Sequence, residues 1–143
     1  MSKVNQHVVN PIIVKENEEI ARRAYEQGDY VLCFLLIHAL IESLLRAFLD
    51  KNGNKTFNDL IIEYEKYLKS VNQSDLTFVK ELTQFNKRRN RVVHELWAKG
   101  YSVTNEKLES VCRVSFIMFG LFIEWLESFD PKITESGFDY EKN

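Results

Sequence analysis

The residues with the most evident chemistry lie in one short run, residues 86–95, which reads NKRRNRVVHE. Four of its residues are cationic within five positions, although the whole chain carries a formal net charge of -2. An arginine such as Arg89 can hold a phosphate through two parallel hydrogen bonds, and an imidazole such as that of His94 can move a proton near neutral pH. Together these two groups suit attack on a phosphodiester.

The spacing within this run decides which side chains could act together. On a helix, Asn90 and His94 lie four residues apart on one face. Arg89 lies about 140° around the helix from His94, but its long arm could still bring the guanidinium near the imidazole. The remaining cations could hold flanking phosphates or serve only solubility: Lys87, Arg88 and Arg91. The alternative is a solvated basic face with His94 as a half-buried, hydrogen-bonded histidine, because charge runs on helices are common.

His38 and Glu42 form a second polar group, four residues apart in an apolar stretch. They could be a supporting polar pair near the site, or they could form hydrogen bonds within a buried helix, because a buried carboxylate needs a partner. Trp97 and Trp125 are expected to anchor the core or an interface rather than to stack on bases.

Metal and nucleotide-cofactor sites are not expected. The three histidines are far apart in the sequence, and no pair has the spacing or the cysteine partners of a zinc site. The chain has no Gly-rich phosphate loop and no GxSxG pattern. Cys33 and Cys112 lie in apolar stretches without CxxC spacing, which is typical of buried thiols in a reducing compartment.

Length and composition favour one soluble, cytoplasmic domain. The 143 residues match a common domain size, and 45% hydrophobic residues can fill its core. The N-terminal sequence contains Asn, Gln, His and Pro where a signal peptide would be apolar. The longest apolar runs, residues 30–41 and 114–123, fall short of the ~20 residues that span a bilayer. No membrane partner is therefore expected.

Glycine, proline and capping residues divide the chain into elements. We expect an N-terminal arm over residues 1–15, a helical domain over 16–129 and a polar tail over 130–143. Apolar periodicity predicts an all-α, antiparallel bundle of four to five helices, without a competing strand pattern. The predicted helices span residues 17–28, 29–49, 58–69, 74–100 and 104–129.

Two of these helices, 29–49 and 104–129, are apolar nearly all round. Such a helix is usually covered on more than one side. A chain of this size has little other helix to cover both, so we expect a homodimer, with a monomeric bundle as the alternative.

Two segments resemble the HEPN family (higher eukaryotes and prokaryotes nucleotide-binding domains). Arg89-Asn90-x-x-x-His94 resembles the family's Arg-x4–6-His motif, in which a polar residue often follows the arginine. Residues 24–47, with AxxxGDY followed by HAxIExLLRA, are similar to the opening helical pair of many members. The resemblance covers roughly residues 17–129, in the family's order.

The resemblance implies an HEPN-like bundle that dimerises with its two motif helices facing each other. Many members resemble metal-independent endoribonucleases of toxin–antitoxin, abortive-infection and CRISPR-associated systems. By this resemblance Arg89 would bind or polarise the scissile phosphate, Asn90 would orient the site, and His94 would act in general acid–base catalysis. The substrate would be RNA, no cofactor would be needed, and an antitoxin or other protein partner would be a separate chain.

The leading hypothesis is thus an endoribonuclease, a toxin or anti-phage defence effector, with its site at a dimer interface. In one subfamily a tyrosine often sits two residues after the motif histidine, where this chain has Leu96, so adenylylation at that position is not expected. Other members do not cleave RNA. The alternatives are a non-catalytic HEPN module that binds nucleic acid, a nucleotide or a protein, and a purely structural helical dimer.

Overall fold

The helices follow one another with short connections. The structure, a computed structural model, describes residues 11–49 and 55–129, and over these residues it contains six helices and no strand. They are α1 (Pro11–Glu26), α2 (Tyr30–Leu49), α3 (Phe57–Ser70), α4 (Thr77–Lys99), α5 (Tyr101–Asn105) and α6 (Glu109–Phe129). The predicted all-α bundle is confirmed for this part of the chain, although it has six helices rather than the predicted four to five. Helices α2, α3 and α4 begin and end within three residues of their predicted bounds.

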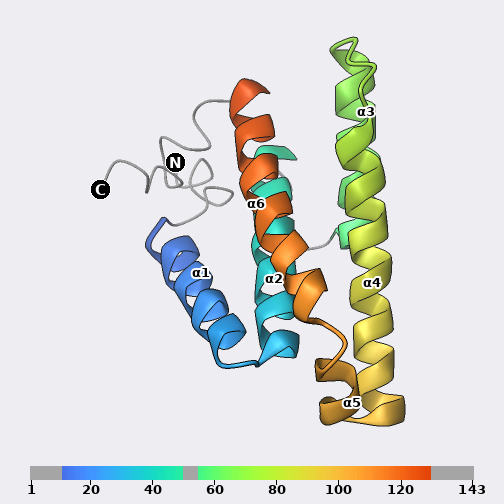
Figure 1. The fold of residues 1–143 in the computed structure, drawn as a ribbon. Coiled ribbons are helices and arrows are strands. Elements are labelled where there is room, and N and C mark those ends of the chain that lie inside the picture. The colour runs from blue at the N-terminus through green and yellow to red at the C-terminus, as the bar shows by residue number, and fades with distance from the viewer. Residues whose placement is uncertain (1–10, 50–54, 130–143) are drawn as a thin grey trace.

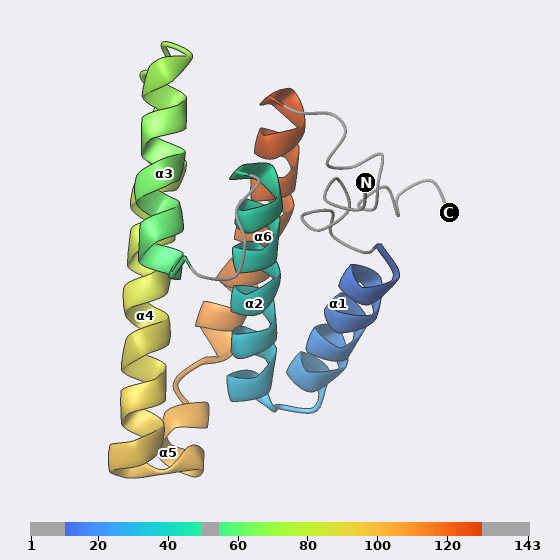
Figure 2. The ribbon, with the colours of Figure 1, turned by 180° about the vertical axis from the view of Figure 1, so that it is seen from behind.

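The central helix of the bundle is α2 (Figure 1). Both α1 and α6 pack against it, and α3 and α4 contact it as a pair of antiparallel neighbours. The view from behind shows α2 between this pair and α1 (Figure 2). In both views α4 continues well past the first residues of α3, so that α3 does not cover the C-terminal half of α4.

Apolar side chains on nearly every side make α2 the core of the fold. Nine of its residues are buried, and Phe34, Ile37 and Ile41 are fully so. Among the described helices, α2 is long and apolar enough to cross a membrane by length and composition, and half of its most apolar stretch is buried inside the bundle. Burial by neighbouring helices on several sides accounts for its all-round apolar pattern.

The two cysteines belong to this core. Cys33 of α2 and Cys112 of α6 are fully buried free thiols, as their apolar surroundings predict. The Sγ of Cys112 donates to the carbonyl oxygen of Tyr30 at 3.1 Å, and the two thiols interact with each other. They pack as small hydrophobic side chains at the contact between α2 and α6.

The predicted N-terminal arm is too long, because α1 begins at Pro11 rather than after residue 15. Proline is favoured at the first position of a helix, because its fixed φ matches the helical value and an N–H at that position would have no acceptor within the helix. Val14 of this helix is buried, so this stretch belongs to the helical part. Residues 1–10 and the predicted tail, 130–143, lie outside the described residues.

The prediction of one helix over residues 104–129 is wrong, because the chain forms α5 and α6 with a break after Asn105. The Oδ1 of Asn105 accepts a hydrogen bond from the backbone N–H of Val31 at 2.9 Å, and its Nδ2 donates to the carbonyl oxygen of Gly28 at 2.7 Å. The first turn of a helix has N–H groups without intrahelical partners, and this side chain supplies an acceptor for α2. The two hydrogen bonds of Asn105 therefore attach the end of α5 to the turn between α1 and α2.

We expect Asn105→Ala to lower the free energy of unfolding by about 1–3 kcal/mol, because the substitution removes both bonds in a partly buried place. Urea denaturation measures the difference. Asn58→Ala, at an exposed asparagine on α3, is the matched control and should stay within about 0.5 kcal/mol of the wild type. Equal stability of the two variants would contradict this role of Asn105.

Candidate functional site

The imidazole of His38 lies where α2, α3 and α4 meet. Its Nε2 is 3.3 Å from Oδ1 of Asn86 on α4, and the residue is only 4% exposed. Because an amide oxygen can only accept, Nε2 is the donor in this contact. The ring stacks on that of Phe85 with centroids 5.1 Å apart, and Phe57 of α3 lies edge-on at 4.7 Å. His38 of α2 therefore contacts both α3 and α4.

Burial lowers the pKa of His38 to about 4, because desolvation penalises the imidazolium form. The positive charge of Arg89 acts in the same direction, whereas the hydrogen bond to Asn86 and the negative charge of Glu42 oppose it. His38 is therefore neutral near pH 7 and does not suit the role of a general acid there. Its role in this place is to position α4.

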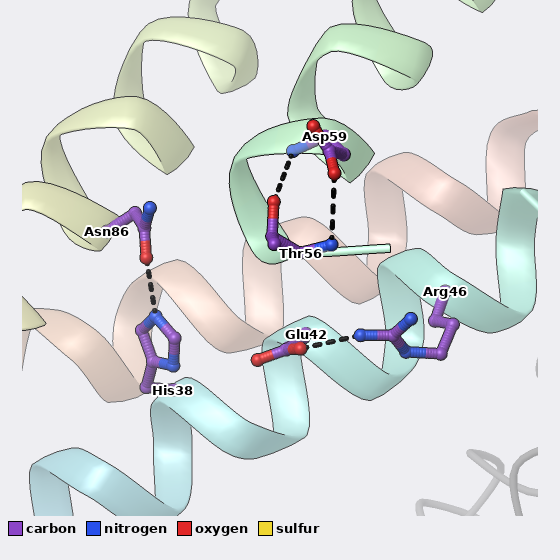
Figure 3. Close-up of polar contacts among 6 residues, drawn as sticks. All are labelled: His38, Glu42, Arg46, Thr56, Asp59 and Asn86. Atoms are coloured by element: carbon purple, nitrogen blue, oxygen red, sulfur yellow. Dashed lines mark hydrogen bonds and ion pairs between the residues drawn. The ribbon is translucent and has the colours of Figure 1, made fainter. Parts of the chain in front are cut away.

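Glu42 forms an ion pair with Arg46, one helical turn further along α2, with 2.6 Å between Oε2 and Nη2 (Figure 3). The two side chains of the predicted His38–Glu42 pair thus have different partners. His38 bonds to Asn86, and Glu42 pairs with Arg46. The charge of Glu42 still acts on the imidazole, so the two side chains share one polar region.

The start of α3 borders this region. Oγ1 of Thr56 accepts from the backbone N–H of Asp59 at 3.1 Å, and the backbone N–H of Thr56 donates to the Asp59 carboxylate at 3.3 Å (Figure 3). This reciprocal capping box fixes where α3 begins. Since α3 begins here, the next turns of α4 toward its C-terminus have no cover from α3.

Arg89 lies one turn after Asn86 on α4 and is half-buried. Its Nη1 donates to Oδ1 of Asn90 at 3.0 Å. The positive charge of Arg89 lowers the pKa of His38, so the two side chains interact electrostatically. Because Asn90 is exposed, this hydrogen bond turns Nη1 of Arg89 toward the side of α4 that carries Asn90.

His94 is exposed, as is Asn90, in agreement with their predicted common face. Trp97, three residues further on, is 88% exposed, so Trp97 is not a core anchor within the described chain, and its expected role as an interface anchor stays a prediction. Trp125 does pack in the core, where its ring lies 5.4 Å from that of Phe78. The side of α4 that carries Asn90, His94 and Trp97 is called the His94 face below.

The other predicted phosphate ligands lie on different sides of α4. Lys87 and Arg91 are exposed. Arg88 is exposed too, but it lines a cleft of about 290 Å³ between α4 and α6. Arg88 and His94 are six residues apart, which places them about 120° apart around the helix. The fold therefore separates Arg88 from the His94 face.

Asn86 is the site residue that the sequence alone did not single out. It occurs on the inward side of an amphipathic helix, one residue after the buried Phe85. A polar residue on that inward side indicates a hydrogen-bond partner on a neighbouring helix. The partner itself, His38, is 48 residues away and could not be inferred from spacing.

Over the described residues, no group of three or more His, Cys, Asp or Glu side chains could hold a metal ion. No protein-family model, no curated protein and no solved structure matches the chain. The function must therefore be argued from the side chains of α2 and α4.

The low pKa of His38 makes stability depend on pH. Above pH 6.5, the ordinary pKa of histidine, both the folded and the unfolded chain leave this ring neutral. As the pH falls from 6.5 toward 4, the unfolded chain takes up a proton that the folded protein excludes, so the free energy of unfolding falls. The slope for one proton is at most about 1.4 kcal/mol per pH unit.

We expect the stability difference between the wild type and His38→Gln to shrink as the pH falls through this window. Glutamine keeps a donor for Asn86 but does not titrate. Urea denaturation of both proteins at several values between pH 8 and pH 4 measures the difference. Parallel pH profiles would show that His38 is not held neutral by burial.

Proposed function

We propose that the chain is an HEPN-like, metal-independent endoribonuclease that uses Arg89 and His94. The observation that carries this proposal is the arrangement on α4. A half-buried arginine donates a hydrogen bond to Asn90, and an exposed histidine follows on the same cation-rich helix. This combination offers a cationic ligand for an anion together with an imidazole that solvent and substrate can reach.

The proposed reaction is transfer of the scissile phosphate to the neighbouring ribose 2′-oxygen. The 2′-OH loses its proton to a general base and its oxygen attacks phosphorus, while the bond from phosphorus to the 5′-oxygen breaks and that oxygen gains a proton. His94 would serve in this acid–base exchange, which contributes about 10²–10⁴ in rate. Arg89 would stabilise the charge that develops on the phosphate, with Asn90 as its orienting partner. The products are a 2′,3′-cyclic phosphate and a 5′-OH.

Arg89 and His94 lie on different sides of α4, so the substrate has to bridge them. An arginine arm can reach around the helix toward a phosphate held on the His94 face. A second copy of α4 is the other way to bring the two groups together, as the resemblance implies. The role as toxin or defence effector and the antitoxin partner are part of the same proposal and follow from the resemblance alone. The proposed cytoplasmic location rests on the N-terminal sequence and the two cysteines.

A second candidate function, a module that binds single-stranded RNA without cleaving it, is favoured by Trp97. An 88% exposed indole beside cations is the combination on which bases stack in single-strand binding. Lys87 and Arg91 are exposed on the same helix and could hold the backbone. Both candidates require RNA on this helix, and they differ in whether His94 takes part in chemistry.

We expect the wild type to cleave labelled RNA in EDTA, and we expect His94→Ala and Arg89→Ala to lose that cleavage. The loss should reach at least about 100-fold for His94→Ala, since acid–base catalysis is removed. Arg23→Ala, at an exposed arginine on α1, is the control and should cleave like the wild type. Fragment ends are read for cyclic phosphate, and circular dichroism checks that each variant folds.

Undiminished cleavage by His94→Ala would refute the assignment. Cleavage that appears only with added divalent metal would refute the metal-independent mechanism. Binding of RNA by all four proteins without cleavage by any would favour the second candidate.

For RNA binding, we expect Lys87→Ala/Arg91→Ala to weaken affinity and to reduce the dependence on salt. Each lost phosphate contact to a single strand lowers the slope of log K against log salt by about 0.7. Titration of a fluorescent oligonucleotide at several salt concentrations measures that slope. Arg23→Ala/Lys66→Ala, which removes the same two types of charge from exposed positions on α1 and α3, is the matched control. An unchanged slope in Lys87→Ala/Arg91→Ala would place the RNA elsewhere.

A further inference from the structure

The two cysteines of the chain lie at matching places in two neighbouring helices. Cys33 is the fourth residue of α2 and Cys112 is the fourth residue of α6, so each lies in the first turn of its helix. Their backbone N–H groups close those turns, on Asp29 in α2 and on Leu108 in α6. The two helices run in the same direction along the bundle (Figures 1 and 2).

The packing of α6 on α2 brings the two thiols together. Both residues are fully buried. The Sγ of Cys112 lies 3.1 Å from the carbonyl oxygen of Tyr30, which is nearly one turn before Cys33 on α2. The two thiols also form a side-chain hydrogen bond with each other. The single S–H of Cys112 can therefore point either to that carbonyl or to the sulfur of Cys33.

The two sulfurs differ in how readily they ionise. The pKa of Cys33 is lowered, because the thiol of Cys112 donates to its sulfur and the positive charge of Arg22 adds to this effect, against burial and the negative charge of Asp29. The pKa of Cys112 is raised, because its hydrogen bond to Cys33 and its burial both favour the protonated form. The N-terminal ends of two parallel helices further favour a negative charge near them. Cys33 is therefore the sulfur that becomes a thiolate first.

We propose that Cys33 and Cys112 form a reversible oxidation site, at which hydrogen peroxide converts the two thiols into a disulfide between α2 and α6. The thiolate of Cys33 attacks one oxygen of peroxide, the O–O bond breaks, and hydroxide leaves while Cys33 becomes a sulfenic acid. The sulfur of Cys112 then attacks that of Cys33, and the sulfenic hydroxyl leaves as water with the proton of Cys112. Hydroxide takes up the proton that Cys33 had lost. Two thiols are thus oxidised, and one peroxide is reduced to two waters.

The position of the pair in two first turns suits this chemistry. The ends of helices open locally at a lower free energy than their centres, so a small neutral oxidant can reach thiols that are buried in the closed state. The disulfide would close a loop of about 80 residues and would stabilise the folded chain by restricting the unfolded one. The inference does not rest on the proposed ribonuclease activity.

The test is treatment of the folded, full chain with hydrogen peroxide, followed by intact mass spectrometry without reductant. We expect the wild type to lose about 2 Da, the mass of the two thiol hydrogens, and to regain it with dithiothreitol. Peptide mapping should find Cys33 linked to Cys112 of the same chain. Thiols that stay free, sulfinic acids formed without a disulfide, or a product of twice the chain mass would overturn the proposal.

Two matched variants test the order of the steps. Cys112→Ser keeps a donor beside Cys33, so its remaining thiol should oxidise several-fold faster than the remaining thiol of Cys33→Ser. Circular dichroism shows that both variants fold. Equal rates, or a faster reaction of Cys112, would contradict the role of Cys33 as the attacking sulfur.

Stability gives a readout that is independent of mass. The urea midpoint of the oxidised wild type should be higher than that of the reduced protein, because the disulfide restricts the unfolded chain. Peroxide should not raise the midpoint of Cys112→Ser. A wild-type midpoint that stays equal or falls on oxidation would show that the disulfide does not fit the packing of α6 on α2, and would overturn the proposal.

Discussion

The hydrogen bond between buried His38 and half-buried Asn86 is the constraint on which the geometry of α4 depends. A helix that packs through apolar contacts alone can adjust its rotation, because many rotations bury similar side chains. A buried imidazole that faces a half-buried amide allows less freedom, since losing the hydrogen bond would leave the imidazole N–H unsatisfied in the core. The two flanking phenylalanine rings hold the imidazole in place.

With its rotation fixed, α4 presents three different sides. The inward side carries Asn86 and, one turn later, the half-buried Arg89. The side beyond the start of α3 carries His94 and the exposed Trp97. The side toward α6 carries Arg88 at the cleft. One cationic run thus supplies a half-buried arginine, an accessible histidine and a charge at the cleft.

The sequence predicted much of the fold, because local signals mark most helix ends. Gly28 and Gly100 both have positive φ at the ends of helices, where glycine is favoured, and the sequence showed both as breaks. The split of the last helix could not be predicted in this way. It depends on the side chain of Asn105, whose partners lie 74 and 77 residues away. Pro11 was taken as part of an arm, although proline is also a good first residue of a helix.

The candidate site was predictable where it depends on spacing along one helix. The common face of Asn90 and His94 and the distance of Arg89 from it follow from helical periodicity. The partners of His38 and Glu42 do not, because periodicity relates residues of one helix and says nothing about which neighbour it meets. The exposure of Trp97 could not be predicted for the same reason, since it depends on where α3 begins relative to α4.

The most direct test is the NMR titration of the His38 imidazole in the folded wild-type protein. The ring proton signal is assigned by its absence from His38→Gln. If the contact with Asn86 is buried as described, the signal should stay unchanged from pH 8 to about pH 5 and titrate with a pKa of about 4. A midpoint near the ordinary histidine value of about 6.5 would mean that the ring is solvated, and α4 would then lack the constraint that places Arg89 and His94.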